Sequence, residues 1–148
     1  MIRPSWNITY MEMCTVLAQR STCIRIQTAA IIVKNNVIIS VGYNGTPSGM
    51  IHCIDYFANQ EIVDSYQHHL WSIENELHGE MNAILSAGRN GISLIGSTMY
   101  SIYSPCINCA KAIVSSGITI VYYKIVYKRD EKGINFLKKC GIDVIIIN

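Results

Sequence analysis

The chain has 148 residues, half of them hydrophobic, and a formal net charge of +2. This length predicts one domain over residues 1–148 that buries roughly two-thirds of its unfolded surface. No apolar run approaches the ~18 residues of a membrane span, and the first residues contain no signal-peptide core, so we expect a cytoplasmic protein without a membrane partner. The small, scattered charge argues against nucleic-acid binding. The six cysteines favour metal-binding or catalytic roles over disulfides in such a protein.

The first half of the chain predicts one helix and one β-hairpin. We expect a helix at residues 6–17, followed by two buried strands at 29–33 and 37–41. A turn-rich loop should follow at 42–49, and an irregular segment at 51–72. The strands are continuous apolar runs, which is typical of strands buried on both faces. Asn35 and Asn36 lie between them, and asparagine tolerates the left-handed conformation of a tight hairpin turn.

The second half alternates helices and strands. The first expected helix begins near Glu80 and ends near Gly88 and Gly91. Three strands are expected at residues 97–102, 119–123 and 144–147, and the helices between them at 104–117 and 131–140. Ser104 suits the N-cap of its helix, Pro105 the first turn and Gly117 the C-terminal end. The order α-β-β-α-β-α-β-α-β predicts an α/β domain of three layers, in which a mixed five-stranded sheet lies between two layers of helices (α-β-α).

Two short motifs carry the chemistry: H-G-E beginning at His78, and P-C-x-x-C containing Cys106 and Cys109. One imidazole and two thiolates suit a tetrahedral zinc whose fourth position stays open for water, which is typical of catalytic zinc. These ligands roughly cancel the metal's charge, so the water can still ionise near neutral pH. Glu80 remains free to move protons. The combination H-x-E with P-C-x-x-C is the signature of zinc nucleobase deaminases.

Local geometry supports one shared metal site. Cys106 and Cys109 are three residues apart, so they share a face in the first turn of a helix, where free amides and the helix dipole favour thiolates. His78 and Glu80 are two apart and can meet only at the edge of a helix, with His78 before its first turn and Glu80 within it. We therefore expect two helix N-termini that face one metal.

Beyond these motifs, the chain resembles the deoxycytidylate (dCMP) deaminases of the zinc-dependent cytidine-deaminase fold. The similar segments are R-P-S-W at 3–6, S-T-C-I-R at 21–25, A-I-I-V at 30–33, G-Y-N-G-T-P at 42–47, H-G-E-M-N-A-I at 78–84 and the cysteine motif at 104–111. The resemblance implies hydrolysis of dCMP to dUMP, a thymidylate precursor. It implies a catalytic zinc held by His78, Cys106 and Cys109, with Glu80 carrying protons to N3 and to the leaving ammonia.

The resemblance also implies substrate contacts. Asn44 would hydrogen-bond the sugar, and Arg25 would bind the 5′-phosphate. The Gly79 amide would contact the pyrimidine carbonyl, and the Ser104 carbonyl would accept from the exocyclic amine. Either Tyr123 or Tyr127 would lie beside the base or sugar. Arg25 and Asn44 also have simpler interpretations, because an arginine is often only a solvated surface residue and an asparagine often only stabilises a turn.

The sequence departs from the family pattern at three places. Thr28-Ala29-Ala30 stands where Val-Gly-Ala is common, Gly79 where alanine is common, and Ile102 where threonine is frequent. Ala29 adds a methyl group where glycine permits close approach of the backbone. We therefore count Ala29 among the substrate-contacting positions and expect the fit of base and sugar to differ.

A second metal site is also implied, because some relatives carry a structural zinc at positions matching Cys23, Cys53 and His68. The fourth ligand is left open between Asp64, one helical turn before His68, and His52. The alternative interpretation is a long loop with free cysteines, which often behave as small hydrophobic residues.

Family members are usually homo-oligomers, often hexamers, that dCTP activates and dTTP inhibits. The resemblance implies the same here, with Mg²⁺ possible on a triphosphate effector and Arg89 as a candidate effector contact. Two other functions stay open: a deaminase acting on both dCMP and dCTP, and a non-catalytic zinc scaffold that binds nucleotides. Glu80 argues against the scaffold, which needs no carboxylate at that position.

Overall fold

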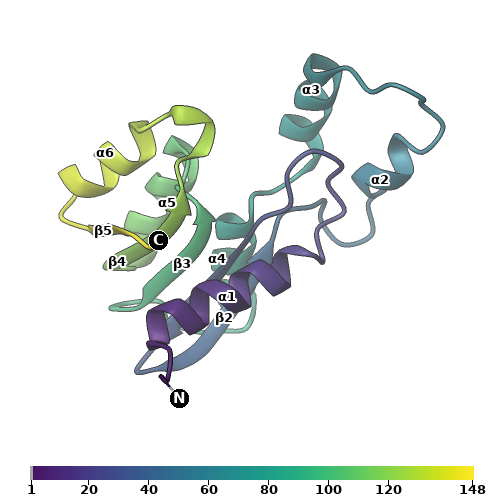
Figure 1. Ribbon diagram of the computed structural model, residues 1–148. Helices are drawn as coiled ribbons and strands as arrows, with labels where there is room; N and C mark the ends of the chain where they lie inside the picture. Colours follow the sequence, from purple (N-terminus) through teal and green to yellow (C-terminus); the bar gives the residue numbers. More distant parts are fainter. Residues whose placement is uncertain (1) are drawn as a thin grey trace.

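The computed structural model describes residues 2–148, except for the side chain of Arg129. Five strands form one sheet in the order β2-β1-β3-β4-β5 (Figure 1). The strands, from β1 to β5, are Ala29–Lys34, Val37–Tyr43, Thr98–Tyr103, Ile120–Ile125 and Asp143–Ile146. Strand β1 is antiparallel to β2 and β3, whereas β3, β4 and β5 run parallel. The expected mixed five-stranded sheet is therefore confirmed.

Helices cover both faces of this sheet. The helices α1, α4, α5 and α6 are Trp6–Ala18, Gly79–Arg89, Ile107–Ser116 and Lys132–Lys139. Helix α1 lies on one face, and α4, α5 and α6 lie on the other, which confirms the three-layer α/β architecture. Two further helices, α2 (Cys53–Tyr56) and α3 (Ser65–Asn75), lie away from the sheet. Among the described residues, no helix is long and apolar enough to span a bilayer.

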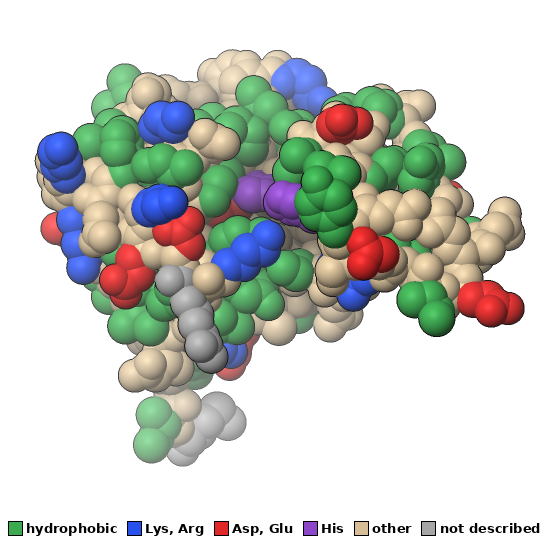
Figure 2. Space-filling model, turned by 90° about the horizontal axis from the view of Figure 1, so that it is seen from above, with side chains coloured by type: hydrophobic (Ala, Val, Ile, Leu, Met, Phe, Trp, Pro, Cys, Tyr) green, Lys and Arg blue, Asp and Glu red, His purple; other side chains and the backbone are tan. Residues whose placement is uncertain are grey.

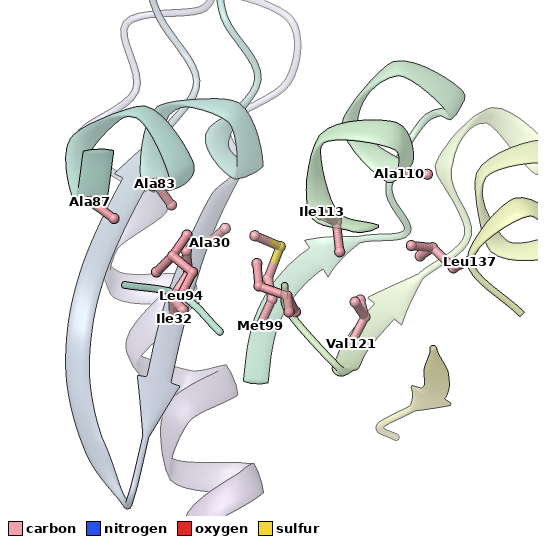
Figure 3. Close-up of a cluster of buried hydrophobic side chains, with 11 residues drawn as sticks. Ala30, Ile32, Ala83, Ala87, Leu94, Met99, Ala110, Ile113, Val121 and Leu137 are labelled. Atoms are coloured by element: carbon pink, nitrogen blue, oxygen red, sulfur yellow. The ribbon is translucent and has the colours of Figure 1, made fainter. Parts of the chain in front are cut away.

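Strand alternation separates two hydrophobic cores. Figure 3 shows the core beneath α4 and α5, where Ala30 and Met99 from the sheet meet Ala83 and Ile113 from the helices. The neighbouring Ala29 belongs instead to the core beneath α1. Because successive side chains of a strand point to opposite faces, the buried residues Ala29 to Val33 of β1 alternate between the two cores.

The expectation that residues 51–72 are irregular is wrong, because α2 and most of α3 lie there. Helix α3 begins after Asp64, whose carboxylate accepts hydrogen bonds from two amides of the first turn. It buries only His68 and Trp71, while other apolar residues such as Leu70 are exposed. With so few buried positions, the apolar periodicity that marks a helix is weak.

Helix α5 begins later than predicted. Its N-cap is Cys106 rather than Ser104, and the Cys106 sulfur lies 3.5 Å from the Cys109 amide. The Ser104 hydroxyl accepts a hydrogen bond from the Tyr127 amide instead, at 2.8 Å. This tertiary contact competes with the local cap. The predicted end is correct, since Gly117 has the left-handed φ of 87° that glycine adopts without strain.

The position of α4 depends on its contact with β2. The Ser40 hydroxyl donates to the Ala83 carbonyl at 2.7 Å, and the Asn82 side chain donates through Nδ2 to the Tyr43 carbonyl at 2.8 Å. Gly42 lies between these contacts, and a methyl group there would collide with the α4 backbone at Ala83. Close approach of helix and strand therefore requires glycine at this position.

We predict that Gly42→Ala lowers the free energy of unfolding by about 1–3 kcal/mol, because it forces backbone movement in a packed core. The matched control is Gly88→Ala on α4, where an added methyl group meets no atom within 4 Å and helix propensity favours alanine by up to about 1 kcal/mol. Urea unfolding measures both. Equal stability of the two variants would contradict the assigned contact.

Candidate active site

Three metal-ligating side chains converge at the N-termini of α4 and α5. His78 is the N-cap of α4, Cys106 is the N-cap of α5, and Cys109 lies in the first turn of α5. The Nδ1 atom of His78 lies 3.5 Å from the sulfur of each cysteine. A tetrahedral zinc with ordinary Zn–N and Zn–S bonds separates such ligand atoms by about 3.5 Å. The residues present therefore fit a zinc ion, as the two motifs predict.

The two thiols of this cluster are electrostatically unequal. Contacts with Cys109 and His78 hold the pKa of Cys106 well below its usual range, since both favour the thiolate. The same contact with Cys106, together with burial, raises the pKa of Cys109. These contacts therefore favour the thiolate at Cys106 and the thiol at Cys109. A metal ion would favour thiolates at both positions, because thiolates rather than thiols are the ligands.

Glu80 lies in the first turn of α4, beside the His78 ligand, and is only 4% exposed. Burial raises the pKa of its carboxyl group to about 7, and the nearby His78 opposes this rise. A carboxyl group that titrates near neutral pH can both accept and release a proton in one reaction cycle. The predicted placement of Glu80, in the first turn next to the metal ligands, is what the structure contains.

A cavity of about 390 Å³ opens beside this cluster, and His78, Cys106 and Glu80 line it. Figure 2 shows histidine side chains within a hollow on this face, with Lys and Arg side chains beside it. Two cationic side chains lining the cavity, Arg25 and Lys128, suit an anionic group. The volume lies within the range of small-molecule sites.

The residues expected to contact substrate fall into two groups. Those that line the cavity are Arg25, Asn44, Ser104 and Tyr127. Those that do not are Ala29, Gly79 and Tyr123. Of the two tyrosines left open by the sequence, only Tyr127 therefore borders the cavity.

The Ala29 methyl group does not affect the cavity in the expected way. Ala29 is fully buried in the core beneath α1, on the sheet face opposite α4. The close approach occurs at Gly79, where an added Cβ would lie 3.1 Å from the Cα atom of Ala29. Strand alternation turns the Ala29 side chain away from the cavity, so the structure provides no direct contact through which its methyl group would alter the fit of base and sugar.

Asn44 holds the loop that follows β2. Its Oδ1 accepts a hydrogen bond from the Thr28 amide at 2.9 Å, and its Nδ2 donates to the Ile26 carbonyl at 2.7 Å. An asparagine side chain has two donor hydrogens and two acceptor lone pairs. One of each is therefore left for a ligand in the cavity, so the turn-holding and ligand-binding interpretations are compatible.

Sequence reasoning missed two basic residues of the cavity. His69 lines it one residue after the buried His68, and Lys128 lines it next to Tyr127. The Lys128 backbone is in the left-handed region, with a φ of 49°, and its ammonium group lies 5.1 Å from the centre of the Tyr127 ring. Such strain at a non-glycine residue is frequent at functional sites. In the sequence, the available signal for Lys128 was its position next to Tyr127, a candidate substrate contact.

A second cluster contains Cys23, Cys53, His68 and Glu76, whose ligand atoms all lie within 4.8 Å of one another. The Nε2 atom of His68 is 3.5 Å from the Cys23 sulfur and 3.4 Å from the Cys53 sulfur. These separations again match tetrahedral zinc. The sequence predicted the first three residues and missed Glu76.

Neither expected fourth ligand belongs to this second cluster. Asp64 caps α3, and the Nδ1 atom of His52 lies 3.5 Å from the Thr46 hydroxyl. One oxygen of Glu76 accepts from Ser72 at 2.7 Å, whereas its buried Oε1 has no hydrogen-bond partner among the described side chains. A buried oxygen without a partner fits a metal ion in the cluster.

Comparison with known proteins is consistent with this geometry. Residues 4–125 match the family model of the cytidine and deoxycytidylate deaminase zinc-binding region. The deoxycytidylate deaminase of Enterobacteria phage T4 is 36% identical over 92% of this chain and 86% of its own length. That of Saccharomyces cerevisiae is 35% identical over 97% of this chain and 45% of its own length.

The fold has a close counterpart among solved structures. The dCMP deaminase from the cyanophage S-TIM5, crystallised in complex with dCMP and dUMP, matches with a TM-score of 0.81 and 30% identity. The match covers 99% of this chain and 100% of that chain. The matched segment therefore includes the whole sheet and the parts of the chain that form both clusters and the cavity.

Proposed function

Because this chain belongs to the cytidine and deoxycytidylate deaminase family, we propose that it hydrolyses dCMP to dUMP and ammonia. The observation that carries the proposal is a buried carboxyl group, Glu80, next to a cluster with only three donors among the described residues. Three protein ligands leave a coordination position open, which separates catalytic from structural zinc. Zinc in this cluster would supply an activated water at that position.

The residues of the chain divide the remaining chemistry. Glu80 takes one proton from the water as the bond from oxygen to C4 of cytosine forms, and delivers it to N3. It then transfers the second proton to the exocyclic amine as the C4–N bond breaks and ammonia leaves. The Ser104 carbonyl would accept from that amine and Asn44 would bind the sugar, and both residues line the cavity. A contact from the Gly79 amide to the pyrimidine carbonyl stays a prediction of the family resemblance, because Gly79 does not line the cavity.

We predict that Glu80→Gln lowers kcat for dCMP by about 10²–10⁴-fold, the usual contribution of general acid–base catalysis, and leaves the zinc content unchanged. The control is Glu74→Gln, an exposed carboxylate on α3. Loss of cytosine absorbance measures the rate. Turnover by Glu80→Gln at the wild-type rate would contradict the mechanism, and a wild-type protein that binds zinc but deaminates nothing would favour the scaffold.

The basic part of the cavity supports a nucleoside monophosphate as the substrate. Arg25, His69 and Lys128 all line it. The Arg25 guanidinium donates to the Val63 carbonyl, which holds its head group in place. A preoriented guanidinium and an ammonium group are the usual partners of a phosphate. We infer that they bind the 5′-phosphate.

Lys128→Met is expected to lower kcat/KM for dCMP by about 10-fold or more, the usual value of one charge-assisted hydrogen bond. Deoxycytidine, which lacks the phosphate, should be nearly unaffected. Lys124→Met is the control, because Lys124 is exposed on β4 and does not line the cavity. Equal losses on both substrates would contradict a phosphate contact. Turnover of dCTP by the wild type would instead favour the dual dCMP and dCTP deaminase.

We propose a structural zinc in the second cluster, with Glu76 as its fourth ligand. Burial raises the pKa of the Cys53 thiol to about 12 and also raises the pKa of the Cys23 thiol, whereas a bound metal would favour both thiolates. The metal would join α2 to α3, whose shared core among the described residues consists of Cys23, Cys53, Phe57 and Trp71, with Val63 packed against it. Because Glu76 lies two residues before His78, the same ion would also brace the segment that leads to the catalytic cluster.

The purified protein is expected to contain two zinc ions per chain by elemental analysis. Cys53→Ser should reduce this to one, because the site loses a thiolate. Cys140→Ser is the control, since Cys140 is exposed and belongs to neither cluster. One zinc ion per wild-type chain, or two in Cys53→Ser, would reject the second site.

The broader expectations from the family stay predictions. They comprise a cytoplasmic homo-oligomer, often a hexamer in relatives, that responds to dCTP and dTTP with Mg²⁺ on the triphosphate. Arg89 is the last residue of α4 and is exposed. It lies at the end of the helix opposite the catalytic cluster, where an effector contact would be separate from the substrate cavity.

A further inference from the structure

Ser104 attaches the chain that leaves β3 to the chain that leaves β4, the parallel neighbour of β3 in the sheet (Figure 1). Its side chain is 1% exposed, and its hydroxyl group accepts a hydrogen bond from the Tyr127 amide at 2.8 Å. The Ser104 amide donates to the carbonyl of Ile125, the last residue of β4, at 2.7 Å. Of these two contacts, only the one through the hydroxyl group depends on the type of residue at position 104.

The segment that the Ser104 hydroxyl holds is a single 3-10 turn, Tyr127–Arg129. Lys128 at its centre has the left-handed φ of 49°. A residue with a side chain adopts this conformation at a cost and keeps it only where surrounding contacts hold the backbone. The hydrogen bond from the Tyr127 amide to Ser104 is such a contact, because it fixes the first residue of the turn.

The two side chains at the start of this turn are held in different ways. The Tyr127 ring packs edge-to-face against His78 and Tyr103, with ring centres 6.2 and 6.1 Å apart, which is a favourable arrangement of aromatic rings. Lys128 is exposed, and its ammonium group lies over the Tyr127 ring. Its position therefore follows from the backbone of the turn. Loss of the Ser104 contact would displace the Lys128 ammonium group more than the Tyr127 ring.

We propose that Ser104 is a positioning residue, whose hydroxyl group holds Lys128 in place for the phosphate of the substrate. The inference rests on the proposed binding of a 5′-monophosphate by Arg25 and Lys128. Ser104 and Lys128 both line the cavity. A cation whose backbone is already ordered loses less conformational freedom when it binds a phosphate. The side chain of Ser104 would thus set the preference for a phosphorylated ligand, while its backbone carbonyl remains available to the base.

Ser104→Ala provides the test, because it removes the hydroxyl group and keeps the backbone carbonyl. We expect it to weaken the binding of dUMP to the zinc-loaded protein about 10-fold, the usual effect of a lost hydrogen-bond partner. Binding of deoxyuridine, which lacks the phosphate, should change less than about 3-fold. Isothermal titration calorimetry measures both affinities, and the zinc content should stay unchanged. Equal weakening of both ligands, or of neither, would overturn the proposal.

The matched control is Ser97→Ala. The Ser97 hydroxyl is also buried and hydrogen-bonded, to the Leu94 carbonyl at 2.6 Å, but Ser97 does not line the cavity. A merely structural loss of this kind should leave the ratio of the dUMP and deoxyuridine affinities unchanged. A change in that ratio as large as the one in Ser104→Ala would overturn the proposal.

A second variant links the effect to Lys128. Ser104→Ala combined with Lys128→Met should bind dUMP as weakly as Lys128→Met alone, because the ammonium group that Ser104 positions is already absent. Losses that add would overturn the proposal. If Ser104→Ala fails to fold, Ser104→Cys replaces it, since sulfur is a weaker acceptor and should give a smaller loss confined to dUMP. An equal loss on deoxyuridine in that variant would again overturn the proposal.

This test separates the inference from the proposed deamination. A wild type that binds dUMP with the expected dependence on Ser104, but does not deaminate dCMP, would overturn the proposed function and leave the inference standing. A wild type that deaminates dCMP, with a Ser104→Ala variant that binds dUMP as tightly, would overturn the inference alone.

Discussion

The site depends on the close packing of α4 against the β1–β2 hairpin. Two glycines allow it: Gly42 on β2 faces the middle of the helix, and Gly79 faces the backbone of β1. This contact fixes the N-terminus of α4, and therefore both His78 and Glu80, relative to the sheet. Helix α5 follows β3 of the same sheet, so the sheet also places Cys106 and Cys109 beside His78.

Burial then gives the residues at this point their chemistry. The Glu80 carboxyl group lies between helix and sheet, and the resulting loss of solvation raises its pKa to about 7. Thiols at the N-terminus of α5 experience free amides and each other, which favours a thiolate at Cys106. The same fold therefore raises the pKa of one carboxyl group and lowers the pKa of a neighbouring thiol.

The two metal clusters are connected through a short segment of chain. Glu76 belongs to the second cluster and His78 to the first, and Leu77 between them pairs with Gly45 through two backbone hydrogen bonds, at 3.1 and 2.9 Å. That pairing ties the segment to the loop that carries Asn44. The helices α2 and α3 also pack through aromatic rings, since Tyr56 and Phe57 contact Trp71 of α3, so the proposed metal would add to this small apolar core.

Sequence alone predicted the three-layer fold, the five strands and the catalytic cluster, because each depends on local features: apolar periodicity, the turn asparagines and the spacing within two motifs. It failed where a residue's role is set by distant parts of the chain. Ser104 is drawn from its predicted cap by Tyr127, Ala29 faces the opposite core, and α3 has too few buried residues to be recognised. Glu76 and Lys128 carry no motif. Their importance arises only where the folded chain encloses a donor or a charge beside the site, since desolvation and proximity are properties of the tertiary structure.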